Sequence, residues 1–181
     1  MSKIKELTLF FLALLIVSCQ EVTSKDESTE LKQAKVEIVE PSLRIEFNFK
    51  TNKSDVFKII MKNIEVDELQ KKDIHIFEEI TPSSHDDSIV AEFGSGNISE
   101  NILISLGGQQ PKIVEIINIS VTYGDKYYDI NTAEDLNKYF IFNKFIEKGL
   151  EEKTFRTKVV DGVSNPLIFF KKTFISTLKR K

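Results

Sequence analysis

The feature that most limits how this chain can fold is a repeated alternation of apolar and polar residues. In 43–49, apolar residues stand at every second position, with Arg44, Glu46 and Asn48 between them. Successive side chains of a β-strand point to opposite faces, so this pattern predicts a strand with one buried face. Further strand patterns occur at 57–61, 74–80, 89–93 and 102–106. The chain is therefore expected to be mainly β.

The longest alternating segment is 113–123. One set of alternate positions holds Ile113, Glu115, Ile117, Ile119, Val121 and Tyr123. We expect Ile117, Ile119 and Val121 to be buried together on one face of a central strand. Gly124 and Asp125 then predict a tight turn into a second strand over 126–130, which makes a hairpin.

The last third of the sequence indicates one or two short helices. Thr132 and Asp135 resemble a capping box, and Leu136, Tyr139, Phe140 and Asn143 would follow in a short helix with one aromatic face. Residues 154–160 alternate again, and 169–178 form a final amphipathic stretch. Strands without a βαβ rhythm favour an antiparallel β-sandwich, either jelly-roll or immunoglobulin-like, with short C-terminal helices.

The segment 106–121 resembles part of a known fold. A strand that ends in Leu106-Gly107, a polar turn and a long alternating strand are similar to the second half of galactose-binding-like jelly rolls, which include many carbohydrate-binding modules. The resemblance implies a sandwich and a glycan ligand. Those families often bind sugar with exposed tryptophan, and this chain has no Trp.

The N-terminus indicates export. Lys3 and Lys5 precede 7–17, eleven residues that are apolar except for Thr8. A transmembrane helix needs about 20 apolar residues, so this segment predicts a secretory signal peptide instead.

Residues 16–19, Ile-Val-Ser-Cys, resemble the lipobox of bacterial lipoproteins. The resemblance implies cleavage after Ser18 and a lipid anchor on Cys19, which would tie the protein to a membrane. An ordinary secretory signal that ends in a cysteine is the alternative. Cys19 is the only cysteine, so no disulfide competes for its thiol. We therefore divide the chain into a signal peptide (1–18), a lipidated cysteine and tether (19–35) and a single β-sandwich domain (36–181).

The tether sequence bears on localisation. Residues 20–35 have no aromatic side chain and many Ser, Thr, Glu and Lys, which predicts disorder. Ser24-Lys25-Asp26-Glu27 resembles the export signal of surface lipoproteins of the Bacteroidetes, although a plain charged linker would look the same. Gln20, where an inner-membrane retention signal has Asp, favours the outer membrane, with the leaflet left open.

Composition argues against several function classes. Loss of 1–18 removes two positive charges and one negative charge, so the formal charge changes from −3 to −4, and no nucleic-acid partner is expected. The terminal basic cluster, residues 171–181, is typical of the cationic end of a helix. No glycine motif for phosphate or dinucleotide is present. We expect no cofactor and no metal: His75 resembles an outward strand residue, and His85-Asp86-Asp87, although able to offer oxygens to Ca²⁺, resembles a solvated loop.

Tyr127 and Tyr128 are the candidate ligand-binding residues. Adjacent strand residues face opposite ways, so at most one of the two rings joins the core unless both faces are covered. The other would offer an aromatic surface beside Lys126 and Asp129. The favoured function is a non-enzymatic binding module, for glycan. The alternatives are an assembly partner that docks another envelope protein and a small hydrolase.

Overall fold

A computed structural model describes residues 40–65, 70–82, 85–96 and 98–180. The expected signal peptide (1–18), Cys19 and the tether (19–35) lie outside the described residues. The described residues belong to one compact unit that spans 38–181. Every strand pairs with a strand between residues 43 and 170, so this unit contains all the partners of its own sheets.

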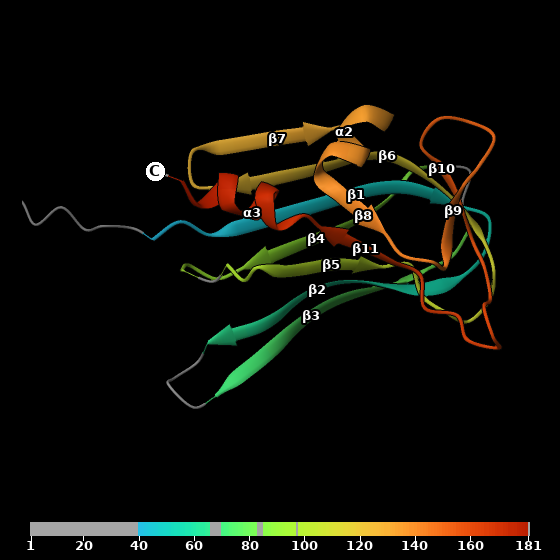
Figure 1. Cartoon of the computed structure of the whole chain (residues 1–181), viewed down its shortest axis with the longest axis horizontal. Coiled ribbons are helices and arrows are strands. Elements are labelled where there is room, and N and C mark those ends of the chain that lie inside the picture. Colours follow the sequence, from blue (N-terminus) through green and yellow to red (C-terminus); the bar gives the residue numbers. More distant parts are fainter. Residues whose placement is uncertain (1–39, 66–69, 83–84, 97, 181) are drawn as a thin grey trace, which may run out of the picture. The chain divides into compact units, whose positions relative to one another are not determined.

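The strands form two antiparallel sheets that pack face to face (Figure 1). In the first, sheet A, the order is β4-β1-β6-β10-β9, and β7 pairs with β6 beside β10. Its strands are β1 (Leu43–Thr51), β4 (Asp87–Phe93), β6 (Ile113–Tyr123), β7 (Lys126–Ile130), β9 (Ile146–Lys148) and β10 (Thr154–Thr157). The predicted antiparallel sandwich is confirmed.

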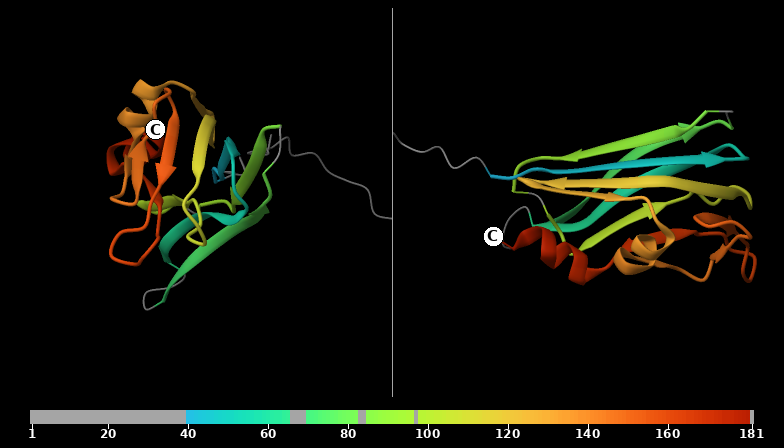
Figure 2. Two further views of the ribbon diagram at one scale, coloured as in Figure 1. Left: turned by 90° about the vertical axis from the view of Figure 1, so that its right-hand side faces the viewer. Right: turned by 90° about the horizontal axis from the view of Figure 1, so that it is seen from above.

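The second sheet, sheet B, has the order β3-β2-β5-β11-β8. Its strands are β2 (Asp55–Glu65), β3 (Lys71–Ile80), β5 (Asn101–Ser105), β8 (Phe140–Phe142) and β11 (Leu167–Phe170). The described residues also form two short helices, α2 (Ala133–Tyr139) and α3 (Lys172–Lys179). Figure 2 shows the two layers from the end and from above.

The core lies between the sheets. Alternate residues of β1 are fully buried, and its aromatic rings meet those of the other sheet: Phe49 lies 4.7 Å from Phe47 and 4.9 Å from Phe57 between ring centroids. Helix α3 packs Phe174 against Tyr128 of β7 and Phe170 of β11. Because β7 belongs to sheet A and β11 to sheet B, α3 links the two layers along one side.

The expected burial in β6 is partly wrong. Ile119 and Val121 are fully buried, but Ile117 is half-buried, and the inward residues before it are Val114 and Ile116. The cause is a β-bulge: Asn48 pairs with Asn118, but Phe49 pairs with Ile116, which leaves Ile117 as an extra residue. One extra residue reverses the faces to which the following side chains point. The inward residues therefore have even numbers before the bulge and odd numbers after it.

The first predicted helix begins as expected but ends earlier. The Thr132 hydroxyl accepts a hydrogen bond from the Asp135 backbone N–H at 3.1 Å, which caps α2. The helix ends at Tyr139, and Phe140–Phe142 form a strand that pairs with β11 rather than extending the helix to Asn143. The strand predicted over 154–160 ends at Thr157, and 169–178 divides between β11 and α3.

A buried ion pair fixes the loop before β6. Lys112 Nζ lies 2.7 Å from Asp55 Oδ2, and both side chains are at most 2% exposed. Lys112 Nζ also donates to the Leu106 carbonyl, and the Asp55 carboxylate accepts from the backbone N–H of Gln109. Gly107 has φ +69°, and a Cβ there would come within 2.1 Å of Asp55 Oδ1. A side chain at position 107 would collide with the Asp55 carboxylate, so the ion pair requires glycine at this turn.

Candidate functional site

The outer face of sheet A is largely polar over four adjacent strands, and Val90 of β4 is an exposed apolar residue within it. We call this surface the polar face. It consists of Arg44, Glu46 and Asn48 of β1, Ser88 and Glu92 of β4, Asn118, Ser120 and Thr122 of β6, and Tyr127 and Asp129 of β7. The strand register aligns them in rows, one of which runs Glu92, Arg44, Thr122, Tyr127. Each residue is outward because its neighbours in the strand point into the core.

A side-chain hydrogen-bond network crosses the polar face. Asn118 is its centre: its amide oxygen accepts from Asn48 Nδ2 at 2.9 Å, and its Nδ2 donates to Asp129 Oδ1 at 2.7 Å. The same Nδ2 lies 3.1 Å from Ser120 Oγ, which is in turn 3.4 Å from the Tyr127 hydroxyl. Residues from three strands are thus held in fixed positions, which gives a ligand a preorganised set of donors and acceptors.

The guanidinium of Arg44 lies at the other end of the polar face. Arg44 donates to Glu46 Oε2 at 3.1 Å and to Glu92 across the strand pair. Hydrogen bonds to Glu46 and Glu92 raise the pKa of Arg44 above its ordinary value, so the guanidinium remains charged. A hollow of about 740 Å³ opens beside this group, lined by Arg44, Glu92 and Thr122. We call it the polar-face hollow.

The two candidate tyrosines lie on opposite faces. Tyr127 is 64% exposed and belongs to the polar face, opposite Thr122. The Tyr128 ring points inward, where it makes edge contacts with Tyr139 and Phe174 at centroid distances of 6.0 and 5.1 Å. Tyr127 is therefore the ring of the two that a ligand can stack on, and Tyr128 helps to pack α3.

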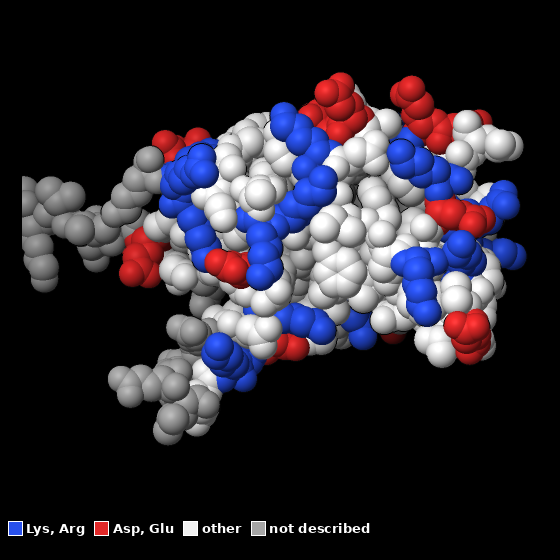
Figure 3. All heavy atoms as spheres, in the orientation of Figure 1, with Lys and Arg blue, Asp and Glu red and all other residues white. Residues whose placement is uncertain are grey.

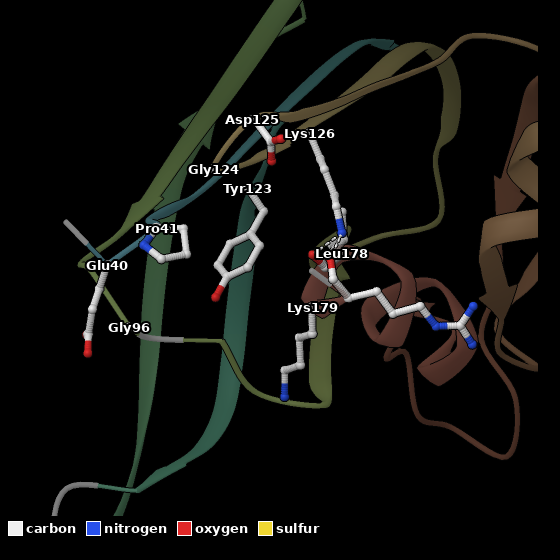
Figure 4. A pocket seen from close by; sticks show the side chains of 10 residues that line it. Glu40, Pro41, Gly96, Tyr123, Gly124, Asp125, Lys126, Leu178 and Lys179 are labelled. Atoms are coloured by element: carbon white, nitrogen blue, oxygen red, sulfur yellow. Dashed lines mark hydrogen bonds between the residues drawn. The ribbon is translucent and has the colours of Figure 1, made fainter. Parts of the chain in front are cut away.

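A second hollow, of about 480 Å³, lies at the end of the sandwich between the β6–β7 turn and the C-terminus of α3 (Figure 4). Figure 4 shows Lys126 reaching to the helix end, where its Nζ donates to the carbonyls of Thr177 at 2.8 Å and Leu178 at 2.9 Å. The ammonium caps the last carbonyls of α3. The ammonium of Lys126 is used in this way, and the other polar residues of the lining are Glu40, Tyr123, Asp125, Lys179 and Arg180. No hydrogen-bonded network like that of the polar face joins these described residues, so we take the hollow as the weaker candidate.

The remaining sequence candidates do not converge. His75 is exposed on β3 of sheet B, whereas Asp87 begins β4 of sheet A and Asp86 lies in the loop just before it. Asp86 pairs with Lys50 at 3.3 Å. Within the described ranges, no three His, Cys, Asp or Glu side chains are grouped as metal ligands. None of the helices in the part of the chain that the structure describes is long and apolar enough to cross a membrane.

Of the polar face, the sequence singles out Tyr127 alone as a candidate ligand-binding residue. Arg44 and Asn48 are predicted only as polar residues of an alternating strand, and Asn118 carries no signal of its own. These side chains are neighbours because β1 lies between β4 and β6, and no local feature of the sequence reveals this strand order. The chain matches no family model, no curated protein and no solved structure.

Proposed function

We propose that this protein is a lipid-anchored lipoprotein of the bacterial outer membrane whose sandwich binds glycan, without catalysis, on the polar face. The observation that carries the proposal is the exposed Tyr127 ring beside a hydrogen-bonded set of amide, carboxylate and guanidinium groups. A sugar has apolar C–H faces that stack on an aromatic ring, and hydroxyls that bind planar polar groups such as these.

The charge of the polar face limits the class of glycan that we expect it to bind. The polar face holds three carboxylates, those of Glu46, Glu92 and Asp129, against the single guanidinium of Arg44. An anionic polysaccharide would therefore meet repulsion. We infer a neutral glycan that lies across the strands, with one ring on Tyr127 and its hydroxyls toward Asn118 and the polar-face hollow.

The binding test uses residues 20–181, which contain both complete sheets. Affinity electrophoresis through gels that contain a panel of neutral and anionic polysaccharides should show retardation by a neutral one. Tyr127→Ala should abolish it, whereas Tyr127→Phe, which keeps the ring, should largely retain it. Phe77→Ala removes an exposed ring from sheet B, 62% exposed, and should have no effect. Retardation that survives both Tyr127→Ala and Arg44→Ala would place the site elsewhere, and the absence of any retardation would refute glycan binding.

The anchor has its own test. Cells that express the full chain and grow with radiolabelled palmitate should label the protein, because the proposed acceptor is the Cys19 thiol. Cys19→Ser should remove the label and release the protein from the membrane fraction. Label retained in Cys19→Ser, or unlabelled wild-type protein in the soluble fraction, would contradict lipid anchoring.

A further inference from the structure

The outer face of sheet B carries an apolar row where the polar face of sheet A has polar groups. The register places Ile60 of β2, Leu103 of β5, Phe169 of β11 and Ile141 of β8 side by side. All four point away from the core, because the residues that flank them in sequence, such as Ile59 and Ile104, point into it. Ile60 and Leu103 are nevertheless buried, and Phe169 is half-buried. The exposed end of the row is Ile141, which is 53% accessible to solvent.

A groove of about 610 Å³ lies at that end of the row. Its apolar lining includes Leu103, Phe169 and Ile141, and its polar rim includes Lys62, Lys171 and Lys172. We call it the sheet B groove. Figure 3 shows uncharged side chains over β8 and β11, with basic side chains gathered beside them over α3.

The rim is positively charged on a chain whose formal charge is −3. Among the described residues that line the groove, Glu100 is the only one with a carboxylate, and it lies 3.7 Å from Lys172 in a pair that is more than half exposed. Such exposed pairs are weak, so the lysine charge remains available to a partner.

The position of two of these lysines is unexpected. The sequence pattern placed the terminal basic cluster at a helix C-terminus, and this is wrong for Lys171 and Lys172: Lys171 is the N-cap of α3 and Lys172 its first residue. The first turn has no acidic residue, and Lys171 makes no side-chain cap. Cations at a helix N-terminus oppose the helix dipole, so helix stability does not explain Lys172. Lys171 Nζ donates instead to the Asn137 carbonyl at 2.6 Å, near the C-terminus of α2.

From this arrangement we propose that the sheet B groove docks an acidic peptide segment of another protein. An apolar side chain of the partner lies on Phe169 and Ile141, and its flanking carboxylates face Lys62 and Lys172. A second copy of this chain is a poor occupant, because a two-fold contact through this groove would bring the lysines against one another. A hollow also suits an inserted side chain better than the flat surface of a membrane.

The test selects a phage library of short random peptides against residues 20–181. The selected peptides should carry an aromatic or aliphatic residue flanked by Asp or Glu. Ile141→Asp should weaken them about tenfold or more, because it puts a charge on the floor. Lys62→Glu with Lys172→Glu should weaken them as strongly, and selection on that variant should yield peptides with basic flanks instead. Rising salt should weaken the wild-type interaction.

Phe77→Asp is the matched control, since it removes an exposed apolar side chain of the same sheet outside the groove, and it should leave peptide affinity unchanged. Unchanged thermal unfolding of each variant confirms that it is folded. Failure to enrich any motif, or selected peptides that tolerate both Ile141→Asp and the lysine reversal, would overturn the proposal. Binding to vesicles that contain phosphatidylglycerol would also overturn it, if no peptide is selected and the same substitutions remove the vesicle binding. The occupant of the groove would then be a membrane.

Discussion

The two outer faces of this sandwich differ in chemistry although one core supports both. On sheet A the cross-strand neighbours are polar and bonded to one another, as in Asn48, Asn118 and Asp129. On sheet B the corresponding row is apolar, as in Leu103, Phe169 and Ile141. If both outer faces contacted only water, polar side chains would be expected on both. On sheet B the row is apolar and is exposed at Ile141, beside lysines, and the docking proposal rests on this exposed end.

The largest expected effect concerns the core beneath the polar face. Ile119→Asp buries an unpaired charge and should lower the free energy of unfolding by several kcal/mol, or prevent folding. Ile117→Asp should cost less, about 1 kcal/mol, because the bulge leaves Ile117 only partly buried beside Asn118. Urea unfolding of the two variants compares the two positions directly. Equal losses would mean that the bulge is misplaced.

The next largest effect on stability is expected at the buried ion pair of Asp55 and Lys112. Lys112→Met leaves the Asp55 carboxylate buried without its cation, and should cost about 3–5 kcal/mol. Lys50→Met removes an exposed lysine from its pair with Asp86 and should cost about 1 kcal/mol at most. Thermal or urea unfolding measures both changes. A small loss for Lys112→Met would show that the pair is open to water.

The smallest effects separate the two outer faces. Asn118→Ala removes the centre of the polar network and should cost about 1 kcal/mol. Ile141→Asp should change stability by about 0.5 kcal/mol or less, because its side chain has no covering element and is already half in water. Calorimetry at one pH suffices for this comparison. If Ile141→Asp were the more damaging change, the apolar row would belong to the folded core and not to a docking surface.

These comparisons also show how far the sequence could predict the structure. Alternation predicted β1 and the hairpin at Gly124-Asp125, and Thr132 predicted the start of α2, because each of these signals is local. The bulge at Ile117 left no signal, since 113–117 is apolar at positions of both parities and permits either register. Phe140 continued the helical spacing of Leu136, but pairing with β11 overrode it.

The candidate site was predictable only in part, for the same reason. Strand alternation required Tyr127 and Tyr128 to face opposite ways, and the structure decides which one is outside. Their partners come from strands far away in sequence: Asn48 and Asn118 are 70 positions apart. Lys112 and Asp55 likewise meet only through the tertiary fold. Side chains that share a face of one strand can be inferred from sequence, whereas neighbours across strands require the strand order.

The most direct test of two separate binding faces is a crossed measurement on two single variants. Tyr127→Ala and Ile141→Asp are each assayed for retardation by the neutral polysaccharide and for affinity toward the selected acidic peptide. We expect Tyr127→Ala to lose the polysaccharide and keep the peptide, and Ile141→Asp to do the reverse, because the two residues lie on the outer faces of different sheets. If one substitution removed both activities while the protein stayed folded, or if neither removed its own, the division of the sandwich into two binding faces would be contradicted.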